Sequence, residues 1–98
     1  MLKTEAKWPL TVYSVDTWTT IATGPCSVTQ LIIANQNPNN AIGFSFKVGD
    51  CVISGIGNKV PAGKAIPANI KSIPLEAGKT LQVRAETTDL HFFATGFQ

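Results

Sequence analysis

The side chains that most often carry out chemistry in proteins are sparse in this sequence. It has one histidine, His91, and two cysteines, Cys26 and Cys51, with no CxxC pair. Covalent catalysis needs a nucleophile beside a base, and a structural zinc site needs about four converging ligands. His91 is followed by two phenylalanines in an alternating segment, where histidine more often packs or contacts a partner than acts as a base. We therefore expect no enzymatic activity, no metal site and no cofactor.

We expect both cysteines to be free thiols that are buried in the core and behave as small apolar groups. A disulfide between Cys26 and Cys51 is the alternative. Residues 1–7 lack the apolar stretch of a secretory signal, so we expect the chain to stay in the reducing compartment where it is made, which disfavours that bond.

Other chemistry-bearing residues have structural explanations. Asp16, Asp50 and Asp89 fall at turn signals, where aspartate hydrogen-bonds its own backbone. Residues 43–47 (GFSFK) lack the last glycine of a nucleophile elbow, and residues 55–57 (GIG) lack the third glycine and the helix of a dinucleotide or phosphate loop.

A nucleic-acid interface is also disfavoured. The GFSFK segment is similar to the base-stacking strand of cold-shock barrels, but its two rings share a face with Ile42 and Val48, which favours core packing. The eight Lys and Arg residues are scattered along the chain and the net charge is only +2, so we expect no nucleic-acid partner.

Length and composition predict one folded domain. The chain has 98 residues, of which 44% are hydrophobic and 14% charged, close to the usual size of a single core. No apolar run approaches the roughly 18 residues of a membrane-spanning helix, so no membrane partner is expected. We assign residues 10–98 to the domain and residues 1–9 to an extended N-terminal arm.

The elements that must position these side chains are short strands. Turn signals recur about every ten residues, which predicts an all-β fold: a compact antiparallel β-sandwich or jelly-roll-like barrel of about seven or eight short strands. Strict alternation of apolar and polar residues makes two strands the clearest, 42–48 and 80–86. Further expected elements are a hairpin of 10–15 with 18–23, a central strand within 26–36, a possible strand at 52–53, an edge strand within 64–73 interrupted by Pro67, and a terminal strand over 90–98.

The two ends of the chain supply the candidate contact residues. The terminal strand carries aromatic side chains on both faces, and one set would form an exposed patch of the kind that contacts another chain. The alternatives are that Phe93 packs under a loop, that Phe97 closes the barrel end and that Trp8 caps its own core. The candidate protein–protein interface comprises Leu2, Trp8, His91, Phe93 and Phe97.

Three segments together resemble a known class of proteins. They are residues 27–37 (SVTQLIIANQN), 44–48 (FSFKV) and 73–85 (IPLEAGKTLQVRA). They resemble small β-sandwich proteins encoded among the structural genes of tailed bacteriophages, in which a strand ending in Ala-Asn or Cys-Asn leads to a polar turn and a Leu-x-x-Gly-x-x-Leu-x-Val hairpin precedes a final aromatic strand. The resemblance covers residues 10–98 and carries no catalytic positions.

This resemblance implies a non-enzymatic virion structural protein. The expected role is a capsid decoration or cement protein that stabilises the particle at junctions between capsid subunits, or else an accessory subunit of the neck or tail. Its partners would be other virion proteins and further copies of itself, and it would be assembled in the bacterial host cytoplasm. Binding would use apolar burial, with strand addition along an exposed edge as a further contribution. The alternative function, from a different class, is a glycan-binding module for attachment to the host. Exposure of Trp18 and Tyr13 beside an acidic turn would favour this alternative.

Overall fold

The computed structural model describes residues 4–11, 16–54, 58–68 and 72–98. Within these residues the chain forms ten strands and no helix, and every strand pairing is antiparallel. The strands are β1 (Glu5–Thr11), β2 (Thr19–Thr23), β3 (Cys26–Asn35), β4 (Ile42–Val48), β5 (Cys51–Ser54), β6 (Lys59–Val60), β7 (Ala65–Pro67), β8 (Ile73–Leu75), β9 (Thr80–Ala85) and β10 (Leu90–Phe97). The all-β antiparallel prediction is confirmed. The strands outnumber those expected because residues 51–75 divide into four short ones. No helix that could cross a membrane is found among the described residues.

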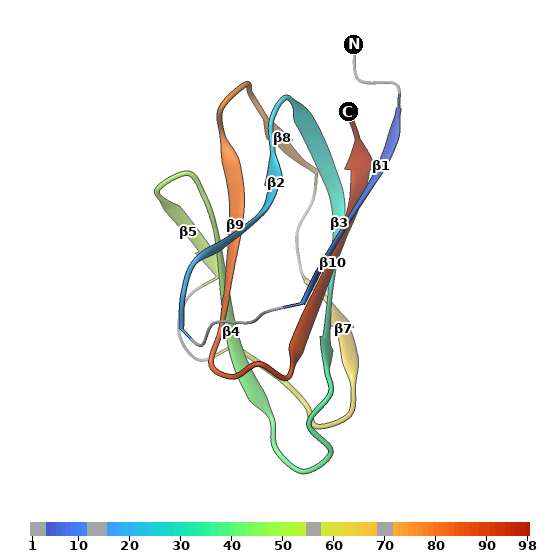
Figure 1. Ribbon diagram of the computed structural model, residues 1–98, viewed down its shortest axis with the longest axis vertical. Helices are drawn as coiled ribbons and strands as arrows, with labels where there is room; N and C mark the ends of the chain where they lie inside the picture. The colour runs from blue at the N-terminus through green and yellow to red at the C-terminus, as the bar shows by residue number, and fades with distance from the viewer. Residues whose placement is uncertain (1–3, 12–15, 55–57, 69–71) are drawn as a thin grey trace.

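The strands form two sheets that pack as the layers of a sandwich (Figure 1). The first, here the β10 sheet, has the order β1-β10-β3-β7, with β8 also paired to β3. The second, the β9 sheet, has the order β2-β9-β4-β5, with β6 also paired to β4. The two layers make an elongated body of 44 × 24 × 22 Å.

Alternating side chains from both sheets fill the core between the layers. Strands β9 and β10 each bury every second side chain, as their sequence patterns predict. Phe44 and Phe46 of β4 are only 9% and 3% exposed, so their rings belong to the core and are not available to stack on bases. The buried residues contributed by these three strands are Ile42, Phe44, Phe46, Leu81, Val83, Ala85, Leu90, Phe92 and Ala94.

Strand β3 is the central strand of its sheet, as predicted. It pairs with β10 along one edge and with β7 and β8 along the other. Leu31 and Ile33 are fully buried in the core, whereas Ile32 lies half-buried on the outer side. A β-bulge leaves Thr29 without a register partner in β10, although its hydroxyl donates a hydrogen bond to the Thr95 carbonyl of that strand at 3.2 Å. Because β3 stays within one sheet and the bulge lies before the apolar run of residues 31–34, that run marks no change of sheet; its outward residues Ile32 and Ala34 are half-buried.

The predicted hairpin of residues 10–15 with 18–23 is wrong. Strand β1 belongs to the β10 sheet and β2 to the β9 sheet, so the chain changes layers between them; residues 12–15 lie outside the described part. After that segment, Asp16 has a positive φ of 52°, and its N–H donates a hydrogen bond to the Ala85 carbonyl of β9 at 2.9 Å. Asp16 is thus anchored to the β9 sheet. The alternation of apolar residues within two strands does not show which sheet each strand joins, so this contact could not be predicted from it.

Much of the segment expected to be an arm lies in the sheet. From Glu5 onward it forms β1, which runs along β10 in unbroken register. The ends of the chain also hold each other, because Thr4 and Gln98 exchange two backbone hydrogen bonds of 3.0 and 2.8 Å. Residues 1–3 lie outside the described part of the chain.

Candidate functional site

The outer side of β10 carries the exposed aromatic residues that the sequence predicts. Because alternate residues of this strand fill the core, His91, Phe93, Thr95 and Phe97 point away from it. Phe93 is 37% exposed and Phe97 is 43% exposed, so neither packs under a loop or closes the end of the fold. His91 and Thr95 are half-buried between their neighbours.

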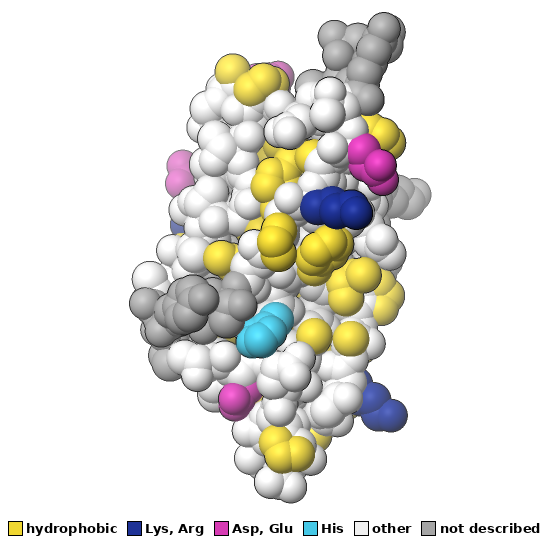
Figure 2. Space-filling model, turned by 45° about the vertical axis from the view of Figure 1, so that its right-hand side comes forward, with side chains coloured by type: hydrophobic (Ala, Val, Ile, Leu, Met, Phe, Trp, Pro, Cys, Tyr) yellow, Lys and Arg dark blue, Asp and Glu magenta, His cyan; other side chains and the backbone are white. Residues whose placement is uncertain are grey.

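Strand register extends this aromatic surface across the whole sheet. Phe93 lies opposite Pro9 of β1 on one side and Ile32 of β3 on the other, and Ile32 lies opposite Pro67 of β7. Residues paired in this way have neighbouring side chains on the same side of the sheet. We call these four residues the outer apolar row. Figure 2 shows hydrophobic side chains gathered on this side of the molecule, close to the single histidine.

His91 borders a shallow depression next to the outer apolar row. The depression has a volume of about 230 Å³ and is lined by Pro9, Leu10, Ile32, Ala34, His91, Phe92 and Phe93. None of these described lining residues is a carboxylate or a nucleophile, so the histidine has no partner there for acid–base chemistry. The geometry suits His91 to a contact surface.

Polar residues flank the apolar row toward the chain ends. In the next outward-facing row Lys7 lies opposite Thr95, and beyond it Glu5 lies opposite Phe97. Lys7 and Glu5 are exposed. An apolar centre with a polar border is the usual anatomy of a protein–protein interface. We refer to the outer apolar row together with His91 and Phe97 as the β10 face.

Prolines weaken the edges of this sheet as sites for strand addition, and strand addition stays a prediction. Pro9 lies in the edge strand β1, and Pro67 and Pro74 lie in β7 and β8 at the opposite edge. Proline has no backbone N–H, so each removes a donor that an added strand would need. Strand β10 itself already pairs on both sides. Side chains of the β10 face are therefore better placed for binding than the strand edges.

The remaining interface candidates divide into two cases. Trp8 packs against the hydrophobic core, because it shares the inward side of β1 with Ala6 and Leu10. It takes the alternative role considered from sequence, capping its own core. Leu2 lies outside the described residues.

The two cysteines are free thiols in different environments. Cys26 is buried and burial raises the pKa of its thiol, whereas Cys51 is exposed, which corrects the prediction that both lie in the core. In the part of the chain that the structure describes, no group of three or more His, Cys, Asp or Glu residues could hold a metal ion.

Sequence reasoning missed Pro9, Ile32 and Pro67 as members of the β10 face. The apolar run around Ile32 was the available signal, since a strand buried on one side only should carry a polar residue there. The two prolines could be placed only once the register was known. Comparison of the chain with known protein families, with curated proteins and with solved structures finds no match.

Proposed function

We propose that this protein is a non-enzymatic structural component of a bacteriophage virion, specifically a capsid decoration protein that binds at junctions between capsid subunits through its β10 face. The observation that carries the proposal is the outer apolar row, on a sheet whose edge strands contain prolines. The resemblance of residues 10–98 to small phage β-sandwich proteins supports the same role.

The size of the exposed aromatic surface fits a protein that works in many copies. Phe93 and Phe97 are 37% and 43% exposed, which leaves about 160 Å² of ring surface if a whole side chain presents about 200 Å². Complete burial would contribute about 4 kcal/mol at about 25 cal/mol per Å². Association costs at least about 4 kcal/mol in lost freedom, so one such contact alone binds weakly. Several linked copies engaging one particle would gain avidity.

The proposal includes self-association. An oligomer cannot form by extending β10, which is already flanked by β1 and β3. Copies would instead contact one another through side chains at a surface that leaves the β10 face free to bind the capsid. A neck or tail subunit would use the same contacts, and the choice of particle in the binding assay distinguishes these positions.

The test is co-sedimentation of the purified protein with empty capsids of the phage that encodes it, combined with its solution mass from light scattering. We expect an oligomer that sediments with capsids. The double variant Phe93→Thr/Phe97→Thr removes the exposed rings and should lower the affinity for capsids at least tenfold.

The matched control is Val52→Thr/Ile53→Thr, which alters two exposed side chains on β5 of the other sheet, 52% and 50% exposed. It should bind capsids as the unaltered protein does. Circular dichroism must show that both double variants remain folded. A folded monomer that ignores capsids, tails and necks would contradict the virion proposal, and equal binding by the two variants would contradict the role of the β10 face.

A further inference from the structure

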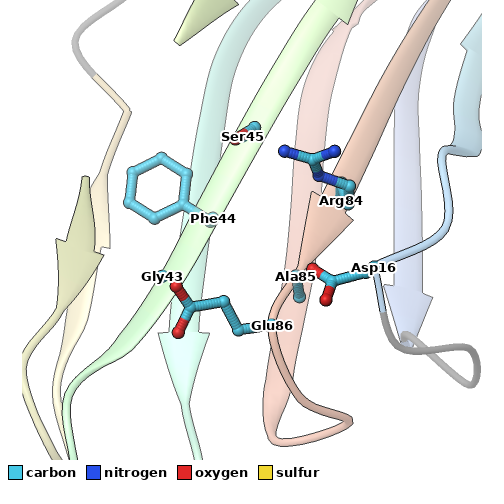
Figure 3. A pocket seen from close by; sticks show the side chains of 7 residues that line it. All are labelled: Asp16, Gly43, Phe44, Ser45, Arg84, Ala85 and Glu86. Atoms are coloured by element: carbon cyan, nitrogen blue, oxygen red, sulfur yellow. The ribbon is translucent and has the colours of Figure 1, made fainter. Parts of the chain in front are cut away.

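The outer side of the β9 sheet holds a pocket with a different chemistry from the β10 face. Its volume is about 650 Å³, within the range of sites for small ligands, against about 230 Å³ for the depression beside His91. Its lining combines two carboxylates, a guanidinium, a hydroxyl and a small apolar surface (Figure 3). The lining residues are Asp16, Gly43, Phe44, Ser45, Arg84, Ala85 and Glu86.

Pairing of β4 with β9 brings the polar groups together. Ser45 lies directly opposite Arg84 in this pair. Beyond the end of β9, the N–H of Glu86 donates a hydrogen bond to the Gly43 carbonyl at 3.0 Å. A Cβ on Gly43 would collide with the Glu86 carboxyl, so glycine there leaves the space that this carboxyl occupies. Two paired strands thus provide a rigid base for three of the polar groups.

Asp16 completes the pocket from another segment. Its backbone N–H is bonded to the Ala85 carbonyl, and its positive φ is one that aspartate tolerates better than most residues. Figure 3 shows its carboxylate directed toward the same space as Arg84 and Glu86. Among the described residues, no hydrogen bond or ion pair joins the Asp16 or Glu86 carboxylate to another side chain. Both carboxylates can therefore accept hydrogen bonds from a ligand.

Trp18 orients the cationic part of this surface. The Arg84 guanidinium lies 5.0 Å from the centroid of the Trp18 ring, and the Lys47 ammonium lies 4.6 Å from it. Both distances are within the range of cation–π attraction. The ring limits the freedom of Arg84 without using up its hydrogen-bond donors, so these donors can serve a ligand.

We propose that this pocket binds a neutral saccharide. Neighbouring hydroxyls of a sugar can donate to the Asp16 and Glu86 carboxylates and accept from Arg84, while Ser45 can do either. The charged groups lining the pocket sum to −1, and the neighbouring Lys47 brings the local sum to zero, so no net positive charge favours phosphate, sulfate or acidic sugars. Two carboxylates beside a guanidinium are a poor cage for a bare cation. The site is separate from the β10 face, so the inference does not depend on the proposed virion role. Tyr13, named beside Trp18 as a sugar contact, lies outside the described residues.

The test is a titration of the isotope-labelled full chain followed by NMR amide shifts. The probes are glucose, galactose, mannose and N-acetylglucosamine, with inorganic phosphate and sialic acid as anionic comparisons. We expect saturable shifts at Ser45, Arg84 and Glu86 with at least one neutral sugar and none at these amides with the anions. No saturable shift with any neutral sugar, shifts confined to another surface, or equal binding of the anions would overturn the proposal.

Variants separate the pocket from the rest of the fold. Asp16→Asn and Glu86→Gln keep the side-chain shapes but remove a charged acceptor, and each should weaken binding at least tenfold. Glu76→Gln makes the same change at an exposed carboxylate in the turn before β9 and should leave affinity unchanged. The Phe93→Thr/Phe97→Thr protein should bind the sugar normally, so failure of the capsid proposal and failure of this one remain distinguishable. Unchanged affinity in both pocket variants would refute the assignment.

Discussion

Asn35, at the end of β3, is the polar residue on which the packing of the adjacent loops most depends. It is 3% exposed. Its Nδ2 donates toward the carbonyls of Asn40, Val60 and Pro61 at 2.9, 3.0 and 3.3 Å, and its Oδ1 accepts from the Asn37 N–H at 2.8 Å. One side chain therefore ties the polar turn after β3 to the end of β6. Replacing it with alanine should destabilise the whole fold.

The expected loss in free energy of unfolding depends on which of these hydrogen bonds water can replace. The bond to the Val60 carbonyl is buried, whereas those to Asn40 and Asn37 are partly open. A lost buried partner costs about 1–3 kcal/mol and a partly solvated bond about 0.5–1.5 kcal/mol. For Asn35→Ala we expect the free energy of unfolding to fall by about 3 kcal/mol. In a domain of this size that corresponds to a fall in Tm of roughly 12–24 °C.

Urea unfolding followed by circular dichroism measures this loss, with the slope against urea expected to stay unchanged. Asn35→Asp keeps the shape but turns the donor into an acceptor facing three carbonyls, so it should destabilise at least as much as alanine. Asn40→Ala is the matched control, because the bond from Asn35 uses only the Asn40 backbone. It should change stability by no more than about 0.5 kcal/mol. The reasoning is refuted if Asn35→Ala or Asn35→Asp is as stable as the control.

Further predictions concern the glycines and the thiols. A Cβ at Gly96 would collide with the backbone carbonyl of Ser27, so Gly96→Ala should lower the free energy of unfolding by more than about 2 kcal/mol. A Cβ at Gly43 would meet only the movable side chain of Glu86, so Gly43→Ala should lower it by less than about 1 kcal/mol in the same urea assay. Ellman's reagent should modify Cys51 quickly and Cys26 only after unfolding; two fast thiols would contradict the burial of Cys26. Burial raises the pKa of the Cys26 thiol above that of an exposed thiol, so its contribution to stability should be constant while the thiol of the unfolded chain is protonated and should decline as the pH rises further into the alkaline range. The decline should be absent from Cys26→Ala, and an equal decline in both proteins would exclude Cys26 as its source.

Sequence alone could predict those parts of the fold where one strand covers one side of the core. The alternation over 80–86 and 90–98 depends only on the period of a strand and a single apolar side, and the structure confirms both. The strand at 42–48 is also confirmed, but all residues from Ile42 to Phe46 are buried, so its outer side is covered too and the expected half-buried pattern is wrong. The alternation over 90–98 gave the outward direction of Phe93 and Phe97 correctly. The alternation is also present in β1, where Trp8 is in phase with Ala6 and Leu10, and this phase indicates that the Trp8 side chain points inward.

The errors and omissions depend on contacts between distant segments. Whether two neighbouring strands share a sheet is not encoded in their alternation, so β1 and β2 could pass for a hairpin. The outer apolar row requires the register of four strands, and the saccharide pocket requires β4, β9 and Asp16 to meet. These residues are far apart in the chain, and each alone has an ordinary role in a strand or turn.

The two-layer fold places the two proposed surfaces on opposite sides of the molecule. The β10 face is the outer side of one sheet, and the pocket is on the outer side of the other, with the shared core between them (Figure 1). If the β10 face binds a capsid, the pocket must point away from the particle. An open pocket with few hydrogen-bonding groups binds a sugar weakly as a single copy, but an array on a particle presents many copies to a cell surface at once. The same multiplicity that compensates for the small apolar contact with the capsid would then compensate for weak saccharide binding.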